Sequence, residues 1–368
     1  MSRIGIDCRL WNETGVGRYI RNLVQNIAKI DKKNKYILFL RREEFETVPI
    51  FGENFEKKLA EVRWHTIKEQ TKFKKILENE KLDLMHFPYF SYPVFYSGKF
   101  VITVHDLILN HFPTGKATTL PSPLYWLKQA GYKFVLSSGV RNARKIIAVS
   151  KSTRDEIIDH YNISSGKIAV TYEGIDETLK EEKMEKVDTP HPYFFYVGNA
   201  YPHKNLELLV ESFKKFLLKT NEIVDLIFVG KEDFFYKRLK EEVEKKGLGQ
   251  RIHFFQNITD GQLVYLYHHA KAVVLPSLME GFGLPALEAM ANNCLVVASE
   301  IPSFMEICGD SAVYFDPYDE DSLCGVLQEV FADRVAVKEK KRSGEKRIKN
   351  FSWKKMAEET LKVYEENL

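Results

Sequence analysis

Two glutamates flank a glycine-rich turn in the segment PSLMEGFGLPALEAMA, residues 276–291. The apolar run AKAVVLPS leads into the turn, and ALEAMA after it has the composition of a buried helix, so we predict a strand, a tight loop and a helix. Gly281 and Gly283 let the loop backbone bend sharply or approach a ligand closely, and Pro285 suits a first helical turn. The free amides at such a helix start favour an anion such as phosphate.

The two carboxylates, Glu280 and Glu288, are predicted to reach the same cavity. Glu280 precedes the loop, and Glu288 lies one turn inside the helix, where its Cβ tilts back toward the amino end. Phosphate would repel both groups, so they are better explained as acceptors for the hydroxyl hydrogens of a sugar or a ribose. The alternative is a plain helix start with two solvated glutamates, which would be preferred if only one of these features were present.

Two other stretches carry residues that could complete such a site. The stretch TVHD places His105 at the carboxyl end of an apolar strand, where ligands collect in open parallel sheets, whereas His86 is interpreted as structural. In WNETGVGRY, Gly15 and Gly17 would let the backbone approach a phosphate, although a short strand-to-helix connection explains them equally well. A dinucleotide-binding fingerprint is disfavoured, because Ile20 stands where that motif needs a small residue.

The elements that must position these residues repeat one pattern in each half of the chain. At 368 residues the chain is too long for one ordinary core, and both halves alternate apolar strands with amphipathic helices. We therefore predict two Rossmann-like α/β domains, residues 1–172 and 191–351, each with a parallel sheet. A charged stretch, residues 173–190, would link them, and a final helix over 352–368 would begin at a Ser352 cap.

Composition limits the class of protein. Lys and Arg number 54 against 51 Asp and Glu, a formal net charge of +3, which argues against a dedicated nucleic-acid binder. The four cysteines lack CxxC or Cys/His spacing, so we expect buried thiols in a reducing compartment and no metal site. No apolar run approaches the length of a membrane span, and we expect a cytoplasmic protein. Aromatic and basic residues mixed over 122–144 could contact the inner face of the plasma membrane or an acidic acceptor, or pack on the sheet with the charges in water, which is more common.

Five motifs, taken with the two-domain pattern, resemble the retaining glycosyltransferases of family 4, which have the GT-B fold. EGFGLPALEAMA resembles that family's E-x7-E signature, PHKNLELLVESF its phosphate-binding loop, VHD its N-terminal-domain histidine, GVGRY its glycine loop and FSW the start of its C-terminal helix. The resemblance covers nearly the whole chain. It implies two Rossmann-like domains that face a cleft, with the C-terminal helix returning to the N-terminal domain. Within the family, the pattern is most similar to bacterial mannosyltransferase-like enzymes of surface polysaccharide synthesis.

The resemblance implies a hexosyltransferase that binds its nucleotide-sugar donor mostly on the C-terminal domain and its acceptor on the N-terminal one. The first choice of donor is GDP-mannose, and the acceptor would be a glycan or a lipid-linked glycan. Neither a metal nor another cofactor is implied. The alternatives are a UDP-sugar-dependent glucosyl, galactosyl or N-acetylhexosaminyl transferase of the same family, a sugar-nucleotide epimerase, and a non-catalytic nucleotide-sugar sensor.

Transferred residue by residue, the resemblance implies three catalytic residues. Lys204 would neutralise the leaving diphosphate, Glu280 would contact the sugar hydroxyls, and His105 would contact donor sugar or phosphate. Backbone amides and the ribose-binding carboxylate complete the set. The implied donor-binding residues are Gly15, Gly17, His203, Lys204, Phe282, Gly283, Leu284 and Glu288.

Two positions depart from the family pattern. Asn199 and His203 stand where relatives carry arginine, so one guanidinium of the phosphate clamp is missing. Lys204 would then carry more of the positive charge. Because a histidine ordinarily titrates near neutral pH, diphosphate affinity is expected to depend on pH between about 6 and 8.

Overall fold

The protein folds into two compact units. The computed structural model describes residues 1–112, 122–175 and 183–368, with the backbone alone for 122–124. One unit comprises Met1–Gly174 and Ser352–Leu368, and the other Ile175–Phe351. The predicted linker, residues 173–190, lies partly outside the described residues.

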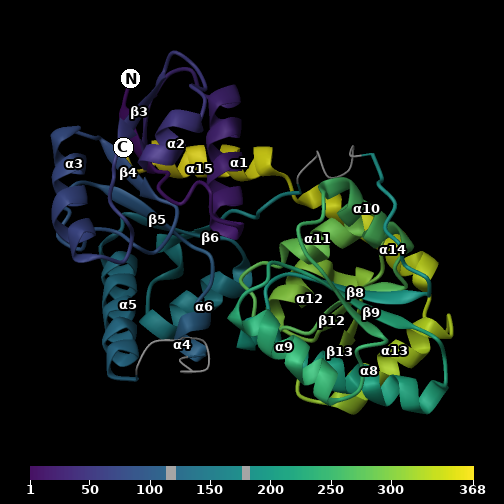
Figure 1. Cartoon of the computed structure of the whole chain (residues 1–368). Helices are drawn as coiled ribbons and strands as arrows, with labels where there is room; N and C mark the ends of the chain where they lie inside the picture. The colour runs from purple at the N-terminus through teal and green to yellow at the C-terminus, as the bar shows by residue number, and fades with distance from the viewer. Residues whose placement is uncertain (113–121, 176–182) are drawn as a thin grey trace. The chain divides into compact units, whose positions relative to one another are not determined.

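The first unit is built on a parallel sheet of seven strands in the order β3-β2-β1-β4-β5-β6-β7. Figure 1 labels β3, β4, β5 and β6 of this sheet and the helices α1, α5 and α15 of the same unit. The strands are β1 (Arg3–Asp7), β2 (Lys35–Leu40), β3 (Phe55–Leu59), β4 (Leu84–Phe87), β5 (Phe100–Val104), β6 (Lys145–Ala148) and β7 (Ile168–Val170). The helices are α1 (Gly15–Ile30), α2 (Arg42–Thr47), α3 (Lys74–Asn79), α4 (Ile108–His111), α5 (Ser122–Asn142), α6 (Lys151–Tyr161) and α15 (Trp353–Glu365). Strand β5 is buried along its whole length, Thr103 included, as its largely apolar run predicts for a central parallel strand.

The C-terminal helix α15 packs against α1 in this first unit, which confirms the predicted return of the last helix. The Ser352 hydroxyl accepts a hydrogen bond from the Lys355 amide and caps α15, as expected. Tyr364 of this helix reaches His86, whose Nδ1 lies 2.6 Å from the phenol oxygen. His86 is fully buried, and its Nε2 lies 2.8 Å from the hydroxyl oxygen of Thr103, so the structural interpretation of this histidine is confirmed.

The second unit repeats the architecture with a parallel sheet of six strands in the order β10-β9-β8-β11-β12-β13. The strands are β8 (Tyr193–Val197), β9 (Asp225–Val229), β10 (Ile252–Phe255), β11 (Ala272–Leu275), β12 (Val296–Ser299) and β13 (Ala312–Phe315). The helices are α8 (Leu206–Thr220), α9 (Phe234–Lys245), α10 (Asp260–His269), α11 (Leu284–Ala291), α12 (Pro302–Cys308), α13 (Glu320–Phe331) and α14 (Val337–Arg347). The prediction of two parallel α/β sheets is therefore confirmed.

Each sheet reverses its chain order at one point. In the first unit the reversal lies between β1 and β4, and in the second between β8 and β11. The loops that leave the carboxyl ends of two such neighbouring strands run to opposite sides and leave a crevice where ligands of open α/β sheets bind. The loops after β8 and β11 carry Lys204 and Glu280, so both residues lie at such a point.

Two expectations from composition concern thiols and membrane spans. All four cysteines are buried and free, as predicted: Cys8, Cys294, Cys308 and Cys324. Within the described ranges, no helix combines the length and apolarity that crossing a membrane requires.

Candidate active site

The loops after β8 and β11 are joined directly. The two strands pair in parallel, with Phe195 opposite Val273, so their carboxyl ends lie side by side. The Leu278 amide of the second loop donates a hydrogen bond of 2.8 Å to the carbonyl of His203 in the first loop. This contact fixes the segment Pro202–Lys204, a single 3₁₀ turn, against the glycine-rich turn.

An ion pair between Lys204 and Glu280 forms the centre of the candidate site. The Lys204 Nζ lies 2.5 Å from Glu280 Oε1, and the two side chains are 15% and 14% exposed. The Ser277 hydroxyl donates to the same carboxylate oxygen at 2.7 Å. Burial alone would raise the pKa of Glu280, but the charges of Lys204 and His203 and the hydrogen bonds from Lys204 and Ser277 together lower it. The carboxylate therefore stays ionised and compensates the ammonium beside it.

His203 does not supply a second cation. Burial and the neighbouring Lys204 lower the pKa of His203 to about 4, although Glu280 acts in the opposite direction. The imidazole is therefore neutral at pH 6 to 8, and the pH-dependent phosphate binding expected from the residue type is wrong for this group. The physical reason is first that the ring is buried and second that it lies beside the Lys204 ammonium.

The glycine-rich turn opens helix α11 as predicted. Gly283 has φ +101°, and a Cβ at this position would lie 2.8 Å from the Phe304 ring, so only glycine fits without strain. Helix α11 begins at Leu284, and Pro285 lies in its first turn. Phe282 is buried with its ring edge-on to Phe351, so its side chain belongs to the packed interior of this unit.

Glu288 is held by a partner that belongs to another helix. Its side chain is only 6% exposed, and its Oε2 accepts a hydrogen bond of 3.0 Å from the Tyr267 hydroxyl of α10. The phenol fixes the position of the carboxylate one turn inside α11. Glu280 and Glu288 are thus anchored by different partners, an ammonium and a phenol respectively.

Gly15 and Gly17, the two glycines of the first unit that were predicted to bind the donor, have different surroundings. A Cβ on Gly17 would lie 2.6 Å from the carbonyl oxygen of Trp11 and 2.8 Å from that of Leu10, so close packing within the loop already requires a glycine there. A Cβ on Gly15 would meet nothing within 4 Å. The open backbone at the start of α1 is therefore at Gly15.

His105 lies at the carboxyl end of β5, and acceptors face both of its ring nitrogens. Nδ1 is 3.3 Å from Glu173 Oε1, and Nε2 is 2.9 Å from the carbonyl oxygen of Pro88. Burial would lower the pKa of His105, but the Glu173 carboxylate, the Pro88 carbonyl and Asp106 raise it. Because both acceptors are satisfied only when both nitrogens carry a proton, the geometry favours an imidazolium. Tyr19 packs edge-on against the ring at 4.9 Å.

Three supporting residues escaped the sequence analysis. Ser277 lies inside the motif already singled out, and its hydroxyl next to a strand end was the available signal. Tyr267 and Glu173 carry no local signal, since their roles arise only when α10 packs beside α11 and when β7 ends near β5. The chemistry that these residues support is clear from their types. A compensated ammonium, a helix start and a fixed carboxylate can bind a phosphate and a hydroxyl-rich group together.

Comparisons with known proteins agree with this chemistry. A family model described as "Glycosyl transferases group 1" matches residues 177–350, and one described as "Glycosyltransferase Family 4" matches residues 14–179. The O-antigen chain mannosyltransferase RfbU of Salmonella typhimurium is 31% identical over 229 residues, which span 62% of this chain and 60% of that protein. The O-antigen chain mannosyltransferase B of Escherichia coli is 29% identical over 237 residues, 62% of each chain. The match thus spans about three fifths of each relative's length.

Solved structures share the fold over the whole chain. The sucrose-phosphate synthase of Thermosynechococcus elongatus superposes with a TM-score of 0.78 at 18% identity, and covers 100% of this chain and 99% of its own. A glycosyltransferase from Rickettsia africae superposes with a TM-score of 0.73 at the same identity, with 100% and 98% covered. At such identities the likeness establishes the architecture alone.

Proposed function

Because the chain belongs to glycosyltransferase family 4 and has the GT-B fold, we propose that it is a retaining hexosyltransferase. It would move a sugar from a nucleotide-sugar to a glycan or a lipid-linked glycan acceptor. The observation that carries the proposal is the ion pair between Lys204 and Glu280, because Glu280 immediately precedes the glycine-rich turn from which α11 begins. These groups supply what departure of a nucleoside diphosphate demands, a cation and a helix start beside an acceptor for sugar hydroxyls.

Bond cleavage at the anomeric carbon builds negative charge on the diphosphate and positive charge on the sugar. Lys204 and the backbone amides of Phe282, Gly283 and Leu284 would stabilise the first charge, and the Glu280 carboxylate would favour the second. Glu288 would accept hydrogen bonds from the ribose hydroxyls. Attack by the acceptor on the face from which the diphosphate leaves accounts for retention. A covalent sugar–protein adduct trapped with a slow fluorinated donor would show double displacement instead.

GDP-mannose is the proposed donor. Its support is that the two relatives compared above are mannosyltransferases of O-antigen chains. The alternative is a UDP-sugar. A thermal-shift panel of GDP, UDP, GDP-mannose and UDP-glucose separates them, because a ligand at about 100 times its Kd stabilises a protein by about 2.7 kcal/mol. Stabilisation by the uridine compounds alone would overturn the choice of donor and leave the transferase proposal standing.

Transfer itself is tested with purified protein, labelled GDP-mannose and a membrane extract as acceptor source. We expect Lys204→Gln to lower the rate of transfer by about 10²- to 10³-fold, as loss of a charge-stabilising group does elsewhere. Lys219→Gln is the matched control, because that lysine of α8 is half exposed and pairs with Asp321 at 3.2 Å, away from the β8 and β11 loops. Interconversion of donor sugars without any acceptor would show an epimerase and refute the proposal.

A metal is not needed in this mechanism, because Lys204 and the α11 amides provide the positive groups that face the diphosphate. Transfer is therefore expected to continue in EDTA. Activity lost in EDTA and restored by magnesium would contradict this part of the proposal.

In the first unit, His105 is proposed to contact the donor, and Gly15 to allow close approach of the first loop to the diphosphate. The same unit is proposed to contact the inner face of the plasma membrane through helix α5. Trp126 and Phe134 of that helix are 59% and 61% exposed, and Lys128 and Lys133 are exposed beside them. Aromatic and basic side chains of this kind bind the interface of anionic membranes.

A further inference from the structure

Three basic residues stand at the amino edge of the first sheet. Lys99 immediately precedes β5, Arg144 precedes β6, and Lys167 precedes β7. These strands are consecutive neighbours and all run parallel, with Val101 opposite Lys145 and Ile146 opposite Ile168, so the residues that precede them are staggered by one position from strand to strand. With strands about 4.8 Å apart and a rise of about 3.3 Å per residue, the three backbones lie within about 12 Å. The fold thus gathers three cations that are far apart in sequence.

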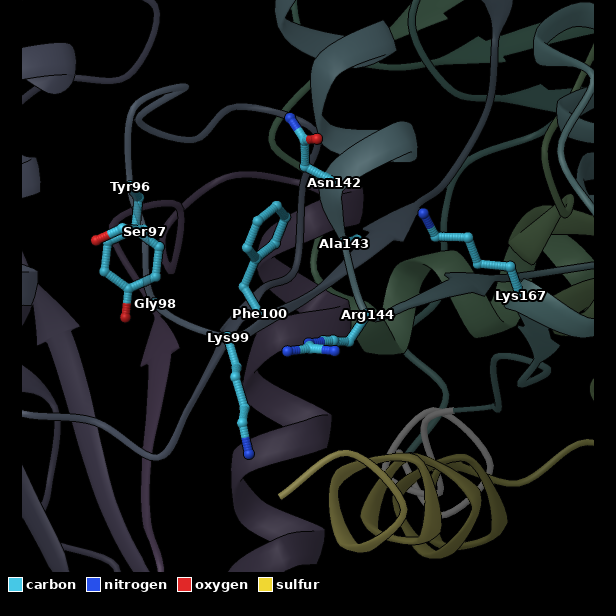
Figure 2. A pocket seen from close by; sticks show the side chains of 9 residues that line it. All are labelled: Tyr96, Ser97, Gly98, Lys99, Phe100, Asn142, Ala143, Arg144 and Lys167. Carbon is cyan, nitrogen blue, oxygen red and sulfur yellow. The ribbon is translucent and has the colours of Figure 1, made fainter.

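The three residues line a cavity of about 530 Å³ (Figure 2). In Figure 2 the three side chains come from separate segments: Arg144 lies below Phe100, Lys99 extends downward from the same segment as Phe100, and Lys167 stands to the right, while the Asn142 amide lies above the Phe100 ring. The Tyr96 and Phe100 side chains are buried, while Lys99, Arg144 and Asn142 are exposed. The size is within the usual range of about 300 to 1,000 Å³ for small-molecule sites. His105 follows the opposite end of β5, so the cavity is at the other edge of this sheet from the candidate donor contact.

The charge around this cavity is not compensated by acidic side chains. Lys99 donates to a backbone oxygen of Leu368, the last residue of the sequence, and Lys167 to the carbonyl of Arg141 in the last turn of α5. Arg144 makes no side-chain hydrogen bond or ion pair with any described residue. None of the five nearby cations pairs with an Asp or Glu side chain in the described part of the chain; they are Lys99, Arg141, Arg144, Lys145 and Lys167. Burial and the charge of Arg141 lower the pKa of Lys167, as a concentration of like charge does.

Other cations at the same edge are compensated. Arg3, the first residue of β1, lies 2.5 Å from Glu80, and Lys35, the first residue of β2, lies 3.0 Å from Glu56. The fold therefore provides carboxylate partners at β1 and β2 and leaves them out at β5, β6 and β7. A helix end explains the contact of Lys167 with the α5 carbonyls, but it does not explain Arg144.

We propose that this cavity is an anion site that binds a phosphate group. Phosphate offers oxygens in several directions, which suits cations that arrive from three segments together with the amide of Asn142 and the hydroxyl of Ser97. The volume leaves room for the substituent of a phosphate ester. The phosphate could belong to a phospholipid headgroup or to a soluble compound. The inference rests on the first unit alone and is independent of the proposed transferase activity.

Lysine acetylation, read residue by residue by mass spectrometry on the full chain, tests the site. Lys99 and Lys167 report on the cavity, Lys35 reports on the rest of the edge, and Lys204 reports separately on phosphate bound at the donor loops. One arm adds inorganic phosphate against sodium chloride of equal ionic strength. The other adds phosphatidylglycerol vesicles against phosphatidylcholine vesicles. At twice its Kd, phosphate leaves about a third of the sites free and should slow acetylation of Lys99 and Lys167 about threefold.

Arg144→Gln should remove most of this protection, whereas Lys35→Gln, which deletes the same charge at β2, should leave it intact. Both changes are at the surface, and an unchanged unfolding temperature shows that the protein remains folded. Protection in the phosphate arm identifies a soluble source, and protection by phosphatidylglycerol alone identifies a headgroup; either supports the site. Equal effects on Lys35, Lys99 and Lys167, protection in neither arm, or full protection in Arg144→Gln would overturn it.

Discussion

Replacement of Glu280 by glutamine separates charge compensation from ligand contact at the centre of the candidate site. Glu280 Oε1 lies 2.5 Å from Lys204 Nζ, and both side chains are about six-sevenths buried. A diphosphate that arrives must share this ammonium with the carboxylate. Glu280→Gln keeps the size of the side chain and removes its charge. We therefore expect tighter binding of the nucleoside diphosphate in this variant and slower sugar transfer.

The distance sets the size of the effect. Two unit charges 2.5 Å apart attract by about 7 kcal/mol at an effective dielectric constant of 20. Desolvation opposes most of this gross attraction. If about a fifth of it acts against phosphate binding, its removal strengthens binding by about 1.4 kcal/mol, which is tenfold in Kd. Lys204→Gln should change affinity in the opposite direction, by tenfold or more.

Isothermal titration of wild type, Glu280→Gln and Lys204→Gln with GDP and UDP measures these changes. Glu207→Gln is the matched control, because this carboxylate lies in the first turn of the neighbouring helix α8, is 48% exposed and pairs with Arg238 at 3.5 Å. It should leave Kd unchanged. If Glu280→Gln weakens nucleotide binding as Lys204→Gln does, the pair acts as one positioning unit, and the argument from charge compensation is refuted.

Three further predictions concern the turn, the ribose-side carboxylate and pH. Gly283→Ala forces a left-handed conformation and a contact with a ring, so thermal unfolding should show a loss of about 1–3 kcal/mol, whereas Gly325→Ala, in open space within α13, should be neutral or stabilising. Tyr267→Phe leaves Glu288 without its phenol donor and should cost about 1.5–3 kcal/mol of stability and weaken nucleotide binding; unchanged values would show that the hydrogen bond is dispensable. The lowered pKa of His203, about 4, keeps the ring neutral, so its contribution to nucleotide binding should be constant from pH 6 to 8. Plots of nucleotide affinity against pH for the wild type and for His203→Gln should therefore run parallel. A difference in affinity that grows toward pH 6 would show protonation of the ring.

The fold could be predicted because its signals are local. Mainly apolar, β-branched runs such as FVITV and KIIA are typical of strands covered on both faces, and they predict β5 and β6 directly. The hydroxyl of Ser352 can accept a hydrogen bond from a helix-start amide, and Gly283 can take a left-handed backbone, so each residue marks where a helix begins. The strand order could be read only from the structure, because the sequence of a strand does not determine which strand lies beside β1 or β8.

The candidate site could be predicted in its residues but not in its contacts. Glu280 and Lys204 are close to a glycine or a proline in the loops after two strands, so the sequence singles them out. Their ion pair, however, joins positions 76 residues apart and forms only because β8 pairs with β11. His203 shows the limit of reasoning from residue type. Its ordinary pKa suggests a titration near neutrality, and burial, together with the Lys204 ammonium beside the ring, lowers the pKa of His203 to about 4.

The two edges of a parallel α/β sheet offer positive groups of different kinds. At the carboxyl edge, helices begin, and their free amides attract anions without any charged side chain, so a single lysine beside α11 suffices there. At the amino edge, helices end, and their carbonyls repel anions. An anion site at that edge must therefore be built from several cationic side chains, and Lys99, Arg144 and Lys167 at the starts of three adjacent strands are such a set. Binding there should weaken steeply with salt, since it depends on exposed charges, whereas binding at α11 should weaken less.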